Sequence, residues 1–457
     1  MMNYLSLFSE LRDRSIRMAL TGAKGGFSRT LLAQCRLIPK ITVSALCDLD
    51  PEGTASLLRS LGFAAASFTI CADAQHVKAA VAQGKTAIVA DHRLLDEVPL
   101  DIVVEATGNP EISMQIALAA IGRHVHVAMV SKETDSVVGP QLNRLARENG
   151  VVYTTADGDQ PSNLIGLVTW AKLLGFDVVA AGKSSEYDYV FDHATGEIDY
   201  TGRLLSVPKM EQLWCLGDDV PGRLRARAEA IAELPQSATP DYCEMNVVAN
   251  STGFGPACDA LSYPLCRVAE LADVFVPEED GGILKRTGVV DVFNCLRRSD
   301  EASFAGGVFV VVRATDGESW ETLRQKGHLL SRNGKYACIY LPYHLMGLET
   351  PISLFSAVLH GRPSGAVDQA RHAVMAMRTT RPFKAGDALR MGGHHHVVTG
   401  VDALLLPAGE ENFRLAPFYL AANKTLRIDI PAGTLIRPEM IDLDGSALYE
   451  LWRTSAA

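Results

Sequence analysis

A stretch near the N-terminus, residues 16–50, constrains the fold of this chain more than any other segment. Its sequence, IRMALTGAKGGFSRTLLAQCRLIPKITVSALCDLD, contains an apolar run of strand length (Ile16–Thr21), a glycine turn, a helical segment that Pro39 ends, and a second apolar run (Ile41–Cys47). Asp48 follows directly. The order of strand, glycine turn, helix, strand and acid is the one that a dinucleotide site at the edge of a parallel sheet requires.

The glycine turn has an uncommon spacing. Gly22, Gly25 and Ser28 form G-x-x-G-x-x-S, and Lys24 occupies the position of the second glycine in the commoner G-x-G-x-x-G. Glycine lets the backbone approach a pyrophosphate closely, and the N-terminus of the following helix offers it free N–H groups and a partial positive charge. An ordinary turn between a strand and a helix is the alternative. The flanking strands, the helix and the acid favour the dinucleotide site.

Asp48 bears on which dinucleotide would bind. A carboxylate at the tip of the second strand can accept hydrogen bonds from both ribose hydroxyls, and it repels a 2′-phosphate. The sequence therefore favours NAD(H) over NADP(H). Lys24 and Arg29 could partly offset this repulsion, so NADP(H) stays open.

The composition excludes several classes of partner and location. The chain has 457 residues, a net charge of −10 and nine cysteines without a C-x-x-C pair. An acidic chain is a poor general partner for nucleic acid or an anionic membrane. We find no apolar stretch of transmembrane length and no secretory signal at the N-terminus. Scattered, unpaired cysteines are typical of reduced thiols, so we expect a cytoplasmic protein of two or three domains.

Polar residues follow each later strand of the predicted α/β domain. The run Asp101–Thr107 leads into Gly108 and Asn109, which could pass beside a nicotinamide ribose or could simply cap the next helix. The run His124–Val130 leads into Ser131 and Lys132. Lys132 could hold an anionic substrate or protonate a carbonyl oxygen, and a solvated loop lysine is the alternative.

The same pattern continues after the next two apolar runs. Val151–Ala156 leads to the loop of Asp157 and Asp159, and Ser162 is predicted to cap the helix that follows. Asp177–Gly182 leads to Lys183. Because the carboxyl ends of parallel strands share one edge of a sheet, we expect Lys132, Asp159 and Lys183 to converge beside the nicotinamide.

The remainder of the chain predicts two further domains. Tyr242–Gly253, Val308–Arg313 and Tyr336–Leu341 read as strands of an α+β substrate domain. Within it, a glycine-punctuated loop over residues 281–291 carries Lys285 and Asp291. The last ninety residues predict a small β-rich module, in which RPFKAGDALR and IDIPAGTLIR resemble each other. The run His394–His396 is a poor metal site, because consecutive residues of a strand alternate between its faces.

Several motifs in one order resemble a known family. They are DIVVEATGNPE, DGDQPSN, VVAAGKS, EMNVVANSTGFGP, GGILKRTGVVD, GVFVVVR and PYHLMGLETP. The chain resembles homoserine-dehydrogenase-like oxidoreductases with a C-terminal SAF domain, a group that includes 1-deoxy-D-xylulose 5-phosphate reductoisomerase-like enzymes. The resemblance implies a Rossmann-type doubly wound parallel sheet at residues 1–160, an α+β substrate and dimerisation domain at 161–368, and an SAF (β-clip) domain at 369–457.

The resemblance also implies site residues and an activity. The implied catalytic residues are Lys132, Asp159, Lys183, Lys285 and Asp291. The cofactor contacts that the resemblance implies are Gly22, Ala23, Gly25, Phe27 and the turn of Ala106, Thr107, Gly108 and Asn109. The positions of Lys24, Gly26, Asp48 and Ser131 at the strand ends add these four residues as candidate cofactor contacts. The expected activity is hydride transfer between NAD(H), or NADP(H), and a small polar keto or hydroxy substrate, which could be phosphorylated.

Three questions stay open at this point. The reductoisomerase-like enzymes use NADPH, whereas Asp48 and Asp50 stand where the best-known pattern has a basic pair. A divalent metal could assist, but no ligand cluster is legible. The alternatives are a homoserine-type or sugar-acid dehydrogenase, and an NAD-binding sensor or assembly protein without turnover. By analogy with homoserine dehydrogenases, we expect a homodimer or homotetramer.

Overall fold

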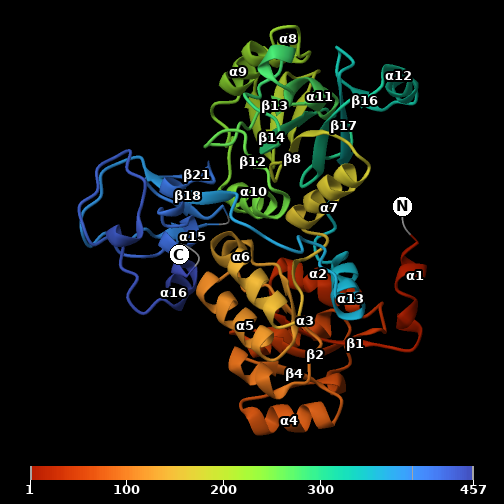
Figure 1. The fold of residues 1–457 in the computed structure, drawn as a ribbon, viewed down its shortest axis with the longest axis vertical. Helices are drawn as coiled ribbons and strands as arrows, with labels where there is room; N and C mark the ends of the chain where they lie inside the picture. Colours follow the sequence, from red (N-terminus) through yellow and green to blue (C-terminus); the bar gives the residue numbers. More distant parts are fainter. Residues whose placement is uncertain (1–2, 394, 455–457) are drawn as a thin grey trace. The chain divides into compact units, whose positions relative to one another are not determined.

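The computed structural model describes residues 3–393 and 395–454, which divide into two compact units. The first unit combines the chain up to Ser162 with residues 345–370 and the chain from Leu443 on. The second unit combines residues 163–344 with residues 371–442. Both units are therefore assembled from separate segments of the chain (Figure 1). The three-domain division expected from the sequence stays a prediction.

The first unit is built on a seven-stranded sheet in the order β3-β4-β2-β1-β5-β6-β7, with every neighbouring pair parallel. Its strands are β1 (Ile16–Thr21), β2 (Ile41–Cys47), β3 (Phe68–Ile70), β4 (Thr86–Val89), β5 (Ile102–Glu105), β6 (His126–Met129) and β7 (Tyr153–Thr155). The strand order reverses between β1 and β5, which is the switch point of a doubly wound sheet. The predicted α/β class and Rossmann-type sheet are confirmed.

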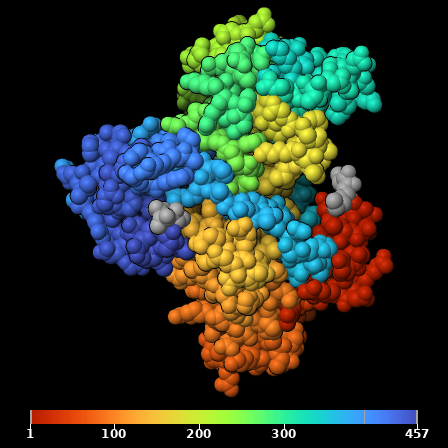
Figure 2. All heavy atoms as spheres, in the orientation of Figure 1, coloured from red at the N-terminus to blue at the C-terminus, as the bar shows by residue number. Residues whose placement is uncertain are grey.

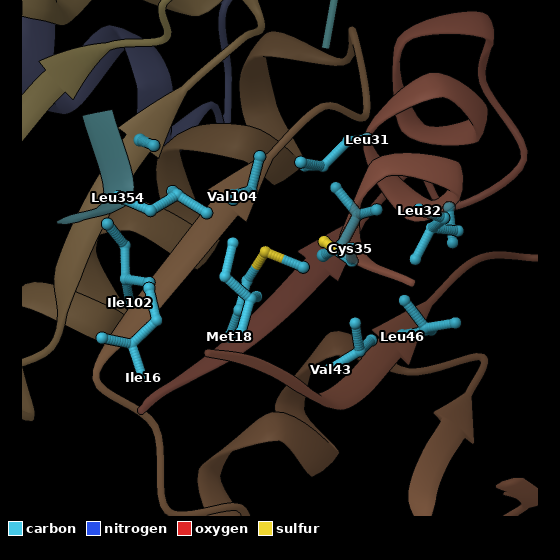
Figure 3. Close-up of a cluster of buried hydrophobic side chains, with 14 of the residues drawn as sticks. Ile16, Met18, Leu31, Leu32, Cys35, Val43, Leu46, Ile102, Val104 and Leu354 are labelled. Carbon is cyan, nitrogen blue, oxygen red and sulfur yellow. The ribbon is translucent and has the colours of Figure 1, made fainter. Parts of the chain in front are cut away.

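Helices from distant parts of the sequence cover this sheet. The helices of the unit include α2 (Gly26–Cys35), α3 (Pro51–Ser60), α4 (Ala74–Ala82), α5 (Pro110–Gly122), α6 (Lys132–Glu148), α13 (Thr350–His360) and α16 (Ala447–Arg453). Apolar side chains of α2, α3 and α13 form one core with those of the strands, and Figure 3 shows Leu31 and Leu354 pointing toward Val104. The α13 segment therefore completes the core of a sheet whose seven strands all lie within residues 16–155.

The two C-terminal segments of this unit, residues 345–370 and the chain from Leu443 on, both contact its N-terminal part. The rings of Phe8 and Phe355 lie 5.7 Å apart, and a ring nitrogen of His360 lies 3.0 Å from the carbonyl oxygen of Leu7. In Figure 2 the light-blue atoms of this late segment lie against the red atoms of the N-terminal residues. Just before α16, the hydroxyl of Ser446 donates to Glu111 of α5 at 3.0 Å.

The second unit contains a mixed sheet in the order β11-β10-β9-β14-β8-β15-β17-β16, with β12 and β13 also paired to β14. Its strands are β8 (Val178–Ser184), β9 (Tyr189–Asp192), β10 (Glu197–Tyr200), β11 (Arg203–Ser206), β12 (Gly255–Pro256), β13 (Leu265–Cys266), β14 (Val289–Arg297), β15 (Val308–Arg313), β16 (Leu329–Leu330) and β17 (Tyr336–Leu341). Its helices include α9 (Val220–Ala230), α10 (Thr239–Thr252), α11 (Leu271–Val274) and α12 (Gly317–Gln325).

The C-terminal part of the second unit is made of short strands, as the sequence indicates. The main pair is antiparallel, β18 (Ala373–Thr379) with β21 (Val401–Pro407), and a smaller pair joins β19 (Met391–Gly392) to β20 (Val397–Val398). The two segments that resemble each other in sequence also pair with each other. Phe383 and Ile430 exchange both backbone hydrogen bonds, at 2.8 and 2.9 Å.

Two local expectations from the sequence are wrong. Tyr242–Gly253 is not a strand but most of helix α10, which starts with Pro240 in its first turn and ends at Gly253 (φ +81°). The helix is buried from Asp241 to Asn250, so its sequence has no polar face that would reveal a helical period. Ser162 does not cap the helix α7 (Gln160–Leu173), because that helix begins two residues earlier.

Candidate active site

Gly22 brings the turn after β1 against the end of β5. Its φ is +62°, and a Cβ at this position would lie 2.6 Å from the carbonyl carbon of Ala106. No other residue type fits such an approach. The hydroxyl of Ser28 donates to the carbonyl oxygen of Gly22 at 2.8 Å and fixes the turn, and Gly25 caps α2. The N–H groups of the first turn of α2 thus point to the switch point of the sheet.

Asp48 organises the loop at the end of β2. Its carboxylate accepts hydrogen bonds from the backbone N–H groups of Lys24 and Asp50, both at 3.0 Å. The ammonium group of Lys24 lies 2.5 Å from Asp50, and this hydrogen bond lowers the pKa of the Asp50 carboxyl. The positive charge of Lys24 is thus paired with the carboxylate of Asp50. The three side chains together carry a charge of −1 where the adenosine ribose of a dinucleotide would lie.

The end of β5 is a network of small polar groups. The buried carboxylate of Glu105 accepts hydrogen bonds from the hydroxyls of Thr21 (3.2 Å) and Thr107 (2.6 Å). The N–H group of Gly108 donates to the hydroxyl of Ser131 at 2.9 Å, which ties the turn after β5 to the turn after β6. The Oδ1 of Asn109 caps α5 by accepting from the N–H groups of Glu111 and Ile112, and the amide NH2 group of the same side chain remains a possible donor to a cofactor.

Lys132 and Asp159 meet at the carboxyl ends of β6 and β7. Their ammonium nitrogen and carboxylate oxygen are 3.1 Å apart, and the side chains are 23% and 9% exposed. The carboxylate also accepts from the N–H group of Gln160 at 3.1 Å. Next to Lys132, burial raises the pKa of Glu133 to about 7. This edge of the sheet therefore carries a partly buried cation that is oriented by a nearly buried carboxylate.

Asp157 anchors the loop that carries Asp159. Its carboxylate accepts hydrogen bonds from the hydroxyls of Ser162 and Ser364, both at 2.7 Å, and burial raises its pKa. Its N–H group donates to the hydroxyl of Ser353 in α13 at 2.7 Å. The late segment of the first unit thus positions the loop of the predicted catalytic acid.

Lys183 does not join this edge, contrary to the prediction from the sequence. It lies on β8, which pairs with β14 and β15 in the mixed sheet and not with β7. Its ammonium group is buried between two carboxylates of α10, Asp241 at 2.6 Å and Glu244. Although β8 is the next strand after β7 along the chain, it belongs to the mixed sheet of the second unit and not to the parallel sheet that contains β7.

The buried cluster of Lys183, Asp241 and Glu244 contains two carboxylates and one ammonium group. Asp241 also accepts hydrogen bonds from the hydroxyls of Ser185 (3.2 Å) and Tyr263 (3.1 Å). Burial raises the pKa of Asp241, and the two carboxylates hold the pKa of Lys183 above its usual value. The sequence contains a signal for Asp241 and Glu244, since acids three residues apart share one face of a helix. This spacing is informative only if the segment is a helix, and the sequence predicts a strand there.

Lys285 and Asp291 are not brought to Lys183. Asp291 pairs with Gly182 across the parallel strands, and the next residue, Val292, pairs with Lys183. Asp291 and Lys183 therefore point to opposite faces of the sheet. Burial raises the pKa of Asp291 to about 6, and its Oδ1 accepts from the N–H group of Ser262 at 2.7 Å. Lys285 is exposed in its loop.

Three further features concern metals, thiols and membranes. Among residues 3–393 and 395–454, no group of three or more His, Cys, Asp or Glu side chains could hold a metal ion. His394 of the histidine run lies outside the described residues. All nine cysteines are free thiols. No helix in the described part of the chain combines the length and hydropathy needed to span a bilayer.

Comparisons with known proteins indicate the class of this chain. Residues 158–350 match a family model described as oxidoreductase DRL, catalytic domain. A search of curated proteins finds no significant match. Similar solved structures include a probable dehydrogenase from Thermotoga maritima (12% identity, 76% of this chain and 90% of that chain, TM-score 0.37). Another is a hyperthermophilic archaeal homoserine dehydrogenase in complex with NADPH (14% identity, 76% of this chain and 98% of that chain, TM-score 0.36).

A third similar structure is 1-deoxy-D-xylulose 5-phosphate reductoisomerase from Zymomonas mobilis in complex with NADPH (19% identity, 38% of this chain and 46% of that chain, TM-score 0.28). The chain thus spans about half the length of this reductoisomerase. The oxidoreductase family match and the Rossmann-type sheet together support an NAD(P)-dependent oxidoreductase.

Proposed function

We propose that this chain transfers a hydride between NAD(H) and a small polar keto or hydroxy substrate. The observation that carries the proposal is the pair Lys132–Asp159, which stands at the carboxyl edge of the same sheet whose switch point holds Gly22. In doubly wound sheets the dinucleotide binds at that switch point and the substrate lies beside it along the carboxyl edge. The first unit thus offers a place for both.

The roles of the two side chains follow from their charges. The bound nicotinamide supplies or accepts the hydride. The ammonium group of Lys132 donates a hydrogen bond to the substrate carbonyl oxygen and stabilises the negative charge that grows there during reduction, or it binds an anionic group of the substrate. Asp159 orients Lys132 by accepting a hydrogen bond from its ammonium group.

We infer that NAD(H) is the preferred cofactor. The acidic set of Asp48, Asp50 and Lys24 supports this choice, because a 2′-phosphate would add two negative charges to a site that already carries one. The two relatives whose structures contain NADPH argue for testing both cofactors. A more specific proposal is a reductoisomerase-like activity, in which the carbon skeleton of the substrate rearranges before it is reduced.

Replacing Asp48 with asparagine should weaken NADH binding about tenfold and strengthen NADPH binding. The loss corresponds to about 1.4 kcal/mol from charged hydrogen bonds to the ribose hydroxyls, and the gain comes from removing a repelling charge. Fluorescence titration with both nucleotides measures the two dissociation constants. Asp73→Asn, which changes an exposed helix-capping acid of the same unit, is the matched control. An unchanged NADPH-to-NADH ratio in Asp48→Asn would refute the role of this acid.

Replacing Lys132 with methionine should lower kcat/KM about tenfold to a hundredfold while the dissociation constant of NADH changes less than twofold. A hydrogen bond from a charged donor contributes about 1.5–3 kcal/mol, and Lys132 is proposed to contact the substrate and not the cofactor. The substrate is found first by screening phosphorylated ketoses, homoserine and sugar acids for absorbance change at the nicotinamide band. Lys78→Met, which breaks the surface pair with Glu97, is the control.

The outcomes of the substrate screen distinguish the three candidate functions. Turnover of 1-deoxy-D-xylulose 5-phosphate with NADPH would establish the reductoisomerase-like activity and overturn the preference for NAD(H). Turnover of homoserine or a sugar acid with NADH would establish a simple dehydrogenase. Tight nucleotide binding without turnover of any compound would support a sensor or assembly protein. We also propose that the part of residues 369–457 that belongs to the second unit, residues 371–442, forms an SAF-type module. The backbone pairing of Phe383 with Ile430 within this part supports the proposal.

A further inference from the structure

A five-residue segment of the late part of the chain, Leu345–Glu349, rests on the first two turns of α2. The hydroxyl of Thr30 donates to the carbonyl oxygen of Met346. Gly347 has a φ of +81°, and a Cβ there would lie 2.7 Å from the carbonyl oxygen of Phe27 and 2.9 Å from the nitrogen of Leu31. Only glycine permits this approach, so the segment is fixed against the helix end that would receive a pyrophosphate.

The same segment also reaches the loop after β7. A Cβ at Gly158 would lie 3.3 Å from the nitrogen of Gly347 and 3.2 Å from the Cβ of Glu349. Immediately after the segment, the hydroxyl of Thr350 donates to the carbonyl oxygen of Asp157 at 2.9 Å. The segment therefore extends from the phosphate-binding end of α2 to the loop that holds Asp159, within one unit of the fold.

The segment exposes three large apolar side chains close together in the sequence. Leu345, Met346 and Leu348 are 45%, 39% and 39% exposed. The terminal carbon of Met346 lies 3.8 Å from the place that a Cβ of Gly26 would take. A cluster of large exposed apolar side chains indicates a surface that binds something. Here it adjoins the donors of a dinucleotide site, and a nicotinamide ring has apolar faces that such side chains would shelter from water.

We propose that Leu345–Glu349 is a wall of the dinucleotide site, and that Met346 packs on the bound cofactor between its pyrophosphate and its nicotinamide. The inference rests on the proposed binding of NAD(H). A methionine suits this position, because its flexible, polarizable side chain adapts to an aromatic ring. The site is thereby built from both ends of the sequence of the first unit, with the glycine turn on one side and this segment on the other.

Replacing Met346 with alanine should weaken NADH binding about tenfold and leave binding of ADP-ribose, which lacks the nicotinamide, within about threefold of wild type. Ile70→Ala is the matched control, because Ile70 is 38% exposed on the edge strand of the same sheet. Bound NADH should also slow the oxidation of Met346 by hydrogen peroxide at least fivefold, measured by mass spectrometry of the full-length protein after digestion. The thermal midpoint of each variant shows that it is folded.

The results distinguish the two proposals. If the wild-type protein binds neither NADH nor NADPH, the proposed function is wrong. If it binds NADH, but Met346→Ala binds it as tightly as Ile70→Ala does and NADH leaves the oxidation rate of Met346 unchanged, the function stands and the wall is refuted.

Discussion

Replacing Lys183 with methionine is expected to lower the free energy of unfolding by about 3–5 kcal/mol. The variant leaves the carboxylates of Asp241 and Glu244 buried without the cation that they share. Removing one partner of a buried ion pair costs more than the pair contributes, because the remaining charge stays out of water. Here two charges stay behind, and they repel each other.

Urea unfolding at several pH values measures this loss. The loss should be larger at pH 8 than at pH 5, since the stranded carboxylates can take up protons at the lower pH and lose their charge. Lys285→Met removes an exposed lysine of the same unit and should change stability by less than about 0.5 kcal/mol. Glu244→Gln, which keeps one carboxylate for the ammonium group, should cost less than Lys183→Met. A loss below 1 kcal/mol for Lys183→Met would show that the cluster is hydrated.

Replacing Gly22 with alanine is expected to weaken NADH binding at least a hundredfold and to lower the free energy of unfolding by about 2–5 kcal/mol. The left-handed backbone costs a non-glycine residue about 1–2 kcal/mol, and crowding against the Ala106 peptide adds about 1–3 kcal/mol. Relief of the crowding would separate the turn after β1 from the end of β5, which is where the dinucleotide is expected to bind.

The variant Gly84→Ala separates the cost of the left-handed backbone from the cost of crowding against Ala106. Gly84 lies in the same unit with a φ of +67°, and no atom lies within 4 Å of the position of its Cβ. Its alanine variant should therefore lose only the backbone part, about 1–2 kcal/mol, and should bind NADH as the wild type does. Thermal unfolding and fluorescence titration of both variants decide the matter. Equal losses in the two variants would mean that the contact with Ala106 relaxes at no cost.

The parallel sheet and its glycine turn could be predicted because their determinants are local. A strand, a turn, a helix and a second strand follow one another within residues 16–50, and each leaves its own pattern in the sequence. The contact of Lys132 with Asp159 could be predicted for the same reason, since each residue lies within four residues of the end of one of two adjacent parallel strands.

Pairing between distant strands has no such local pattern. The order of β7, α7 and β8 along the chain predicts Lys183 at the edge of the first sheet, but the partner strand of β8, β14, begins at Val289. The sequence of helix α10 resembles that of a strand because the helix is surrounded by protein, which removes the polar positions that mark a helical period. For the same reason the sequence does not reveal Asp241 and Glu244 as the partners of Lys183.

The composite origin of the first unit has a consequence for synthesis on the ribosome. The sheet itself is encoded by the first 155 residues, but Leu354 and Phe355 of its core belong to α13. A nascent chain that has just completed the sheet still exposes the apolar face that α13 will cover, and roughly 200 more residues must be translated first. At about 5–20 residues per second this interval lasts about 10–40 seconds. The growing chain thus passes through a period in which chaperones have an apolar surface to bind.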